Sequence, residues 1–264
     1  MISTPARVGS LAIFVIMSLA ASSYASSGIP STDFRSHWAS ELVRLQTWPA
    51  QAERDGDRIT FCGESLSTCQ MRYSAGQSTG LPPVLYLLDR PDGDQFAAGD
   101  THNWGVLEVA DLFNVAGPRT TPDPQQQPFH RAVLTAVRAL DLLAGNTRPS
   151  RRTGLVGEGR GATLALAVAA LRPEEVAFVC ALAPADPAQQ YVYVEDFAAC
   201  VKAPTLIGVG ETDRSERPEV AQRLYDTLPG RKDFIFLPRV RQSGTLRQWA
   251  TVWQNWTGAV LGYQ

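Results

Sequence analysis

Histidine is scarce in this sequence, with only His37, His102 and His130 among 264 residues. Its side chain is the most frequent general base in enzymes and the commonest protein ligand for metal ions. His102 stands in a predicted turn and His130 opens a predicted helix, and neither has a second metal ligand at a useful spacing along the chain. We therefore predict no metal site and no cofactor, and we interpret both residues as structural or surface positions.

An excess of positive charge is also missing. The 24 Lys and Arg residues face 26 Asp and Glu residues, which gives a formal net charge of −2. Domains that bind nucleic acid normally carry a basic patch and a high isoelectric point, so we predict no nucleic-acid partner. Blocks of like charge, which would indicate an interaction tail, are absent as well.

Long hydrophobic runs are not found either. The apolar run Leu11–Ala21 is about half of the roughly 20 residues that a membrane-spanning helix needs, so we predict no span in the mature chain. Arg7 precedes this run, and Ser23 and Ala25 supply small residues at the −3 and −1 positions of a cleavage site. The pattern predicts a signal peptide over residues 1–25 and a secreted or periplasmic protein. A retained N-terminal anchor is the alternative.

Cysteine is limited to Cys62, Cys69, Cys180 and Cys200, and their spacing is not that of a metal site. An even number of cysteines in an oxidising compartment permits two disulfides. Cys62 and Cys69 flank a predicted turn, so a bridge across a hairpin is one expectation. Cys180 lies in an apolar run and can equally be a small buried hydrophobic residue. The pairing is left open.

The remaining pattern predicts an α/β protein. Residues 26–33 are interpreted as a linker and residues 34–264 as one domain, a size that suits a single α/β unit. Predicted strands cover residues 58–62, 69–73, 83–88, 106–113, 154–156, 176–182, 204–209 and 234–237; predicted helices cover 34–48, 129–143, 162–171, 218–228 and 246–261. This alternation favours a mostly parallel sheet of about six to eight strands with helices on both faces. Trp249, Trp253 and Trp256 share one face of the last helix, which favours core packing over a platform for carbohydrate.

A glycine-rich turn marks the candidate site. The segment Gly157-Glu158-Gly159-Arg160-Gly161 joins the strand ending at Val156 to the helix starting near Ala162. A strand, a sharp glycine-flanked turn and a helix form the setting of the nucleophile elbow G-x-S-x-G. Gly159 occupies the nucleophile position and has no side-chain atom that can attack a carbonyl. The spacing fits neither the G-x-G-x-x-G dinucleotide motif nor a P-loop.

Several stretches resemble the acetyl xylan esterase and dienelactone hydrolase branch of the α/β hydrolases. The similar segments are Ala-Val-Arg-Ala-Leu-Asp at 136–141, Gly-Ala-Thr-Leu-Ala-Leu-Ala at 161–167, Ala-Pro-Thr-Leu-Ile-Gly-Val-Gly-Glu-Thr-Asp at 203–213 and Leu-Pro-Gly-Arg-Lys at 228–232. The resemblance covers roughly residues 82–261. It implies the α/β-hydrolase fold, with a minimal cap or none, and a catalytic triad in the chain order serine, acid, histidine.

The triad that the resemblance implies is degenerate here. Asp213 falls on the position of the acid, whereas Gly159 replaces the serine. Gln242, in the predicted loop 238–244, falls roughly on the position of the histidine, and all three histidines precede the elbow. Loss of triad members lowers turnover by on the order of 10⁴- to 10⁶-fold. The leading hypothesis is therefore a pseudoenzyme that acts by binding.

A ligand site is the second expectation from the resemblance. The backbone N–H of Arg160, with one near Asp89 or Arg90, would form the oxyanion hole, and Glu158 stands beside it. This set suggests a small acyl or sugar ligand, although charges at strand ends are often only solvated. Two alternatives stay open: an ester hydrolase in which Glu158 or Asp213 activates water, and a structural or partner-binding protein of the cell envelope.

Overall fold

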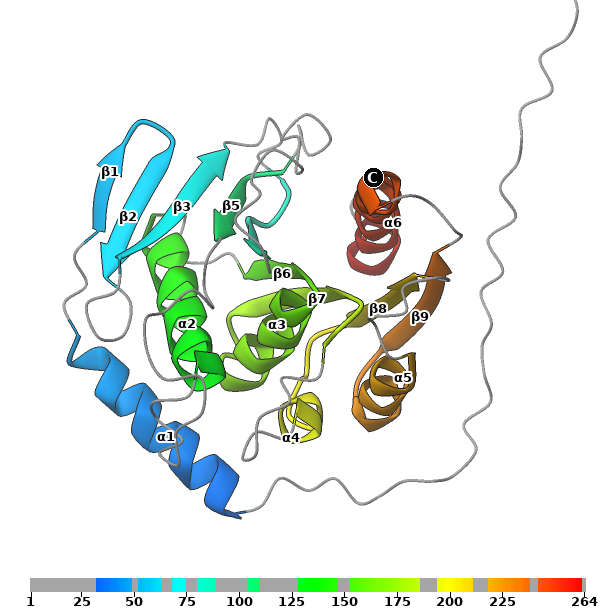
Figure 1. Cartoon of the computed structure of the whole chain (residues 1–264), viewed down its shortest axis with the longest axis horizontal. Coiled ribbons are helices and arrows are strands. Elements are labelled where there is room, and N and C mark those ends of the chain that lie inside the picture. The colour runs from blue at the N-terminus through cyan, green and yellow to red at the C-terminus, as the bar shows by residue number, and fades with distance from the viewer. Residues whose placement is uncertain are drawn as a thin grey trace, which may run out of the picture.

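The computed structural model describes residues 32–48, 52–62, 68–74, 80–88, 104–109, 128–146, 152–185, 194–210, 218–237 and 242–262 (Figure 1). The predicted signal peptide and most of the predicted linker lie outside these residues. The first helix begins at Thr32, two residues before the predicted start of the domain.

In the described residues, nine strands form one sheet in the order β1-β2-β3-β5-β4-β6-β7-β8-β9. They are β1 (Ala52–Asp55), β2 (Arg58–Cys62), β3 (Thr68–Ser74), β4 (Val84–Leu87), β5 (Val106–Val109), β6 (Thr153–Glu158), β7 (Val176–Leu182), β8 (Thr205–Gly210) and β9 (Lys232–Leu237). The run from β5 to β9 in this order is parallel, and the first three strands form an antiparallel meander that joins it through β3 and β5. The predicted mostly parallel sheet is confirmed.

The expected number of strands was too low, because β1 was not predicted. The four residues of β1, Ala-Glu-Arg-Asp, are all exposed and show no hydrophobic alternation. Their strand conformation comes from pairing with β2 across a tight turn in which Gly56 has a positive φ of 60°. A strand held only by its neighbour leaves no pattern in its own sequence.

The helices are α1 (Thr32–Gln46), α2 (Pro128–Asn146), α3 (Arg160–Leu171), α4 (Val194–Ala198), α5 (Pro218–Thr227) and α6 (Gln242–Leu261). All five predicted helices are confirmed, and α4, which is only five residues long, was not predicted. Helix α6 begins four residues earlier than expected. Gln242 and the two residues after it therefore lie in its first turn and not in a loop.

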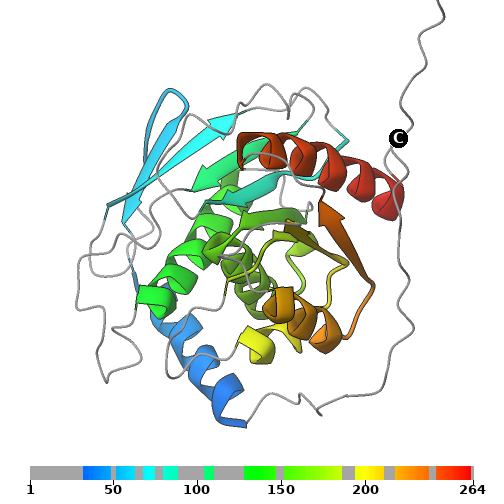
Figure 2. The same ribbon diagram turned by 45° about the vertical axis from the view of Figure 1, so that its right-hand side comes forward.

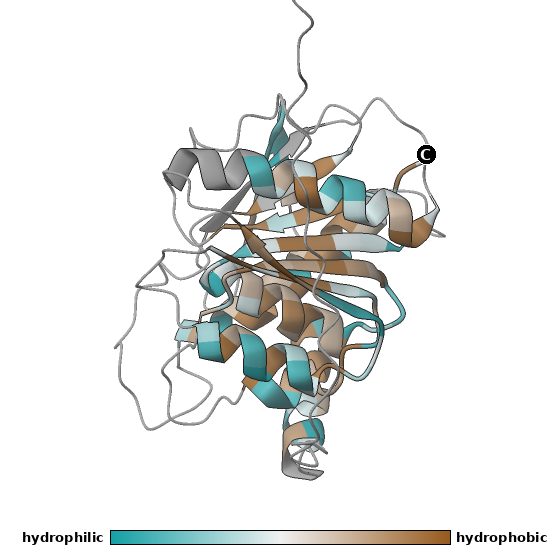
Figure 3. Cartoon of the chain, turned by 90° about the vertical axis from the view of Figure 1, so that its right-hand side faces the viewer, coloured by the Kyte–Doolittle hydropathy of each residue, from teal (hydrophilic) through white to brown (hydrophobic). Residues whose placement is uncertain are grey.

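Side chains of the central strands point alternately into two hydrophobic cores. Leu85 and Leu87 of β4 join the core shared with α1 to α5, whereas Val84 and Tyr86 join the core on the opposite face. Among the described residues, α6 is the helix that covers this second face (Figure 2). The apolar strands lie between the two helical layers (Figure 3). This arrangement confirms helices on both faces.

The tryptophans of α6 fill the second core. Trp249 and Trp253 are fully buried, which confirms their predicted packing role. Trp256 is half-buried, and its indole N–H donates a hydrogen bond of 2.7 Å to the Asp233 carboxylate. None of the helices in the described ranges is long and apolar enough to cross a membrane.

The structure answers the question of pairing for two of the four cysteines. Cys180 and Cys200 are free thiols, so no bridge joins them. Cys180 is buried in β7, and its burial raises the pKa of the thiol well above the ordinary value in spite of a hydrogen bond with Thr257. The side chains of Cys62 and Cys69 lie outside the described part of the structure, and a bridge between them stays a prediction.

Candidate active site

The topology of the sheet marks one place for a ligand. The chain crosses from β4 to β5 on one side, returns to β6 on the other side of β4, and then continues outward to β9. Strand order reverses between β4 and β6, and in open parallel sheets ligands bind beyond the carboxyl ends of the strands at such a point. The glycine-rich turn after β6 lies at this position.

Gly159 takes the backbone conformation that gives an elbow its sharp bend. Its φ is 56° and its ψ is −124°, a region that residues with a side chain rarely occupy. The turn is fixed by the chain after β7, because the Gly159 N–H donates to the carbonyl of Leu182 at 2.9 Å. The Gly159 carbonyl in turn accepts a hydrogen bond from the Ala185 N–H at 3.1 Å.

The two flanking glycines are required by close packing. A Cβ on Gly157 would lie 2.3 Å from the carbonyl oxygen of Gly161, and a Cβ on Gly161 would lie 2.1 Å from the carbonyl oxygen of Leu87. Real Cβ atoms do not approach backbone oxygens this closely. Helix α3 therefore starts in backbone contact with both β4 and β6, which is the strand–turn–helix geometry of a nucleophile elbow.

Two charged residues flank the elbow position. Glu158 ends β6 and is half-buried, whereas Arg160 begins α3 and is exposed. The loop beside them is held by Thr163, whose hydroxyl donates to the carbonyl of Ala185 at 2.6 Å. The turn thus carries one acidic and one basic residue, directly before and directly after Gly159.

The other predicted site residues are placed only by their neighbours in the chain. Asp89 and Arg90 follow the last described residue after β4, and Asp213 follows the end of β8; all three lie outside the described residues. Gln242 is the first residue of α6, and its side chain is also outside the described part. The structure therefore brings together Glu158, Gly159 and Arg160 from the predicted set.

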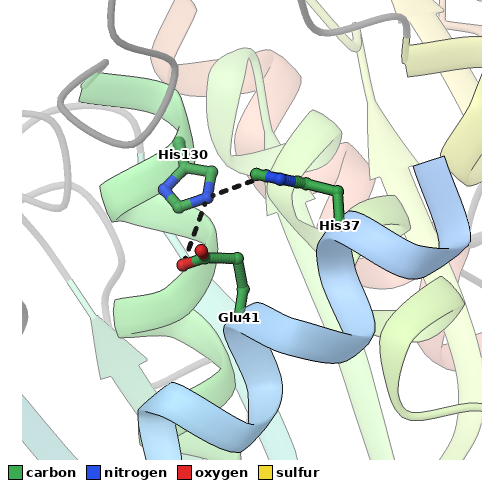
Figure 4. A group of neighbouring side chains, drawn as sticks. All are labelled: His37, Glu41 and His130. Atoms are coloured by element: carbon green, nitrogen blue, oxygen red, sulfur yellow. Dashed lines mark hydrogen bonds and ion pairs between the residues drawn. The ribbon is translucent and has the colours of Figure 1, made fainter. Parts of the chain in front are cut away.

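A second cluster of titratable residues was missed by sequence reasoning. His37, Glu41 and His130 converge between α1 and α2 (Figure 4). Spacing along the chain did not reveal the neighbours of His130, whose Nε2 atom lies 3.3 Å from Nε2 of His37, 93 residues away in the chain. The available signal was the spacing of His37 and Glu41, four residues apart on one helical face.

Similarity to known proteins is found in structure and not in sequence. No protein-family model matches the chain, and no curated protein matches it. An acetyl xylan esterase from Paenibacillus is similar over 86% of this chain and 94% of its own, with a TM-score of 0.68 and 16% identity. Acetyl xylan esterase 1 from Thermoanaerobacterium is similar over 85% and 95%, with a TM-score of 0.57 and 19% identity.

A dienelactone hydrolase from Anabaena variabilis is similar over 76% of this chain and 97% of its own, with a TM-score of 0.54 and 20% identity. This chain has the α/β-hydrolase fold. The predicted fold class is confirmed by these likenesses and by the sheet order. The resemblance also predicted a minimal cap. In the described residues, the connection from β7 to β8 holds only the short helix α4. Residues 186–193 of this connection lie outside the described part of the structure.

Proposed function

We propose that this chain is an exported, esterase-like α/β hydrolase without catalytic activity, which acts by binding a ligand or a partner. The observation that carries the proposal is Gly159, which holds the conformation of a nucleophile elbow but has no side chain. The fold likeness to acetyl xylan esterases supports the esterase-like class.

The chemistry of acyl transfer supplies the reason. Ester hydrolysis on this fold needs a nucleophile at the elbow, a general base within hydrogen-bond reach, and an acid that orients the base. No histidine follows the elbow anywhere in the sequence, so the base is missing together with the nucleophile. An acid at Asp213 would then have no base to orient.

The backbone of the elbow supports a binding role. The two steric glycines and the positive φ of Gly159 preserve a sharp turn that serves no nucleophile. The first N–H groups of a helix have no intrahelical partner, and together with the helix dipole they favour a carbonyl oxygen or an anion at the start of α3. A small acyl or acetylated sugar ligand fits this chemistry, with Arg160 and Glu158 at the rim.

A short-chain ester assay tests the proposal. We expect the purified wild-type protein to hydrolyse p-nitrophenyl acetate no faster than the buffer does. Gly159→Ser, alone and with Gln242→His, tests whether the elbow still accepts a nucleophile. Gly159→Ala is the matched control, because it introduces the same backbone strain, about 1–3 kcal/mol, without a hydroxyl.

Robust turnover by the wild-type protein would overturn the proposal. Turnover that is then lost in Glu158→Gln or Asp213→Asn would establish the alternative in which a carboxylate activates water. Saturable binding of acetylated xylooligosaccharides without hydrolysis would support ligand binding. If neither turnover nor sugar binding is seen, a stable complex with a second envelope protein would favour the role of partner binding.

A further inference from the structure

The cluster of His37, Glu41 and His130, which we name the α1–α2 cluster, is separate from the elbow and unused by the proposed function. His37 and Glu41 lie one helical turn apart on α1, and His130 lies in the first turn of α2. In Figure 4 the Nε2 side of the His130 ring faces both the His37 ring and the Glu41 carboxylate. Three side chains with metal-binding atoms therefore face one point.

Two distances within the cluster fit the spacing of ligand atoms around a tetrahedral metal ion, and the third pair, His37 and Glu41, lies within 4.8 Å. Nε2 of His130 lies 3.3 Å from Nε2 of His37 and 3.5 Å from Oε2 of Glu41, and the donor atoms of all three residues lie within 4.8 Å of one another. A zinc ion with bonds of about 2.0–2.1 Å holds its ligand atoms about 3.3–3.4 Å apart. Both measured distances are close to this edge length and longer than the usual 2.9–3.0 Å or so of an N–H···O hydrogen bond.

The cluster is buried and its side chains are held in place. His130 and Glu41 are 1% and 3% exposed, and His37 is half-buried on the solvent side. The Trp38 ring stacks on the His130 ring, with the centroids 4.8 Å apart. Buried polar and charged groups need hydrogen bonds, ion pairs or a bound cation to offset their lost hydration.

Arg44 holds the Glu41 carboxylate through Oε2, the same oxygen that lies 3.5 Å from His130. Its Nε and Nη2 atoms donate to Oε2 of Glu41 at 2.9 and 2.6 Å. A carboxylate offers about four lone-pair directions over its two oxygens, so with both Arg44 bonds on Oε2 the Oε1 atom keeps lone pairs for a metal ion. The positive charge of Arg44 opposes a second cation, but its side chain is 36% exposed, so water and salt screen this repulsion.

We propose that His37, Glu41 and His130 bind one zinc-type divalent transition-metal ion, which fastens α1 to α2. Two imidazoles and one carboxylate form a donor set that zinc accepts, whereas calcium and magnesium prefer oxygen atoms alone. Water fills the fourth position on the side of His37. The site does not depend on the proposed function of the elbow.

Metal titration of the full chain tests this assignment. The protein is prepared without a histidine tag and stripped with a chelator, and Zn²⁺ binding is followed by calorimetry. Co²⁺ serves as a spectroscopic probe, because four-coordinate Co²⁺ shows intense visible d–d bands. We expect one saturable site per chain with four-coordinate Co²⁺ bands.

Variants then locate the site. His37→Gln and Glu41→Gln should each weaken Zn²⁺ binding by about 100-fold or more, since even loss of an outer-shell partner costs 10- to 100-fold. His102→Gln is the matched control, because it removes the one histidine outside the cluster, and it should bind Zn²⁺ as the wild type does. Near-UV circular dichroism checks that each variant is folded. The wild-type titration decides the matter even if a cluster variant fails to fold.

Two further measurements distinguish a bound metal ion from a hydrogen bond between the His37 and His130 rings. Zn²⁺ should raise the Tm of the wild type but not that of His37→Gln, because a ligand stabilises the state that binds it. Zn²⁺ affinity should also fall as the pH is lowered, because protons compete with a metal ion for its ligand atoms. Absence of saturable binding by the wild type, or binding that His37→Gln and Glu41→Gln leave intact, would overturn the assignment.

Discussion

Single glycines decide whether the elbow can form. Gly161 lies so close to β4 that the Cβ of an alanine would stand 2.1 Å from the carbonyl oxygen of Leu87. Backbone cannot yield as a flexible side chain does, so Gly161→Ala should lower the free energy of unfolding by about 3 kcal/mol or more. Urea denaturation measures this loss.

Gly210 supplies the control for that substitution. It ends β8 at the same edge of the sheet, and a Cβ there would meet nothing within 4 Å. Gly210→Ala should therefore change the stability by no more than about 0.5 kcal/mol. Equal losses in the two variants would contradict the close approach of α3 to β4.

Two adjacent glutamates should titrate in opposite directions from their ordinary pKa of 4.5. A hydrogen bond from Lys202 and its charge lower the pKa of Glu174, whereas burial raises the pKa of Glu175 in spite of Arg172. The contact of Glu174 stabilises the fold above pH 4.5 and is lost as the pH falls through its lowered pKa. Glu175 contributes most below pH 4.5, and that contribution is lost as the pH rises through its raised pKa.

Carboxyl-carbon NMR titration measures both groups in one experiment. We expect Glu174 to titrate below and Glu175 above 4.5, with Glu174→Gln and Glu175→Gln assigning the two signals. The reverse order would show that burial of Glu175 is outweighed by its ion pair with Arg172, which has an Nε–Oε1 distance of 3.5 Å.

At the scale of elements, a buried arginine joins α1 to the body of the fold. Arg138 of α2 is 8% exposed, and its Nη2 atom donates to the carbonyl of Trp48 at 2.6 Å and to that of Leu45 at 3.4 Å. Leu45 lies in the last turn of α1 and Trp48 two residues after its end, where backbone carbonyls no longer have the full set of helical partners. Arg138→Met should cost about 1–3 kcal/mol of stability and expose α1 to limited proteolysis.

Arg152 is the matched control for this arginine. Its side chain is 62% exposed, and its contact with Glu174 is 3.9 Å long. An exposed ion pair of this kind contributes little, so Arg152→Met should change the stability by no more than about 0.5 kcal/mol. Equal proteolysis of α1 in both variants would contradict the role of Arg138.

At the scale of the whole molecule, the sequence was most informative where strands are buried on both faces. Continuous apolar runs such as Val84–Leu87 and Val176–Leu182 are typical of strands in the centre of a parallel sheet. The elbow could be located as well, because its glycines stand between such a strand and an apolar helix. Gly159 was thus found from its neighbours and not from any side chain of its own.

What could not be predicted depends on contacts between distant parts of the chain. β1 is an exposed strand held by β2, and α4 is too short for a helical pattern. The α1–α2 cluster joins residues 93 positions apart, and only the docking of two helices brings their side chains together. Spacing rules that look for metal ligands along one segment do not detect such a site.

The central claim is that the elbow of this α/β-hydrolase fold holds no nucleophile. Intact-mass spectrometry after incubation with a fluorophosphonate, which phosphonylates activated serines, tests it most directly. We expect the mass of the wild-type chain to remain unchanged under conditions that fully label an active serine esterase. A stoichiometric phosphonyl adduct on the wild-type protein would contradict the account.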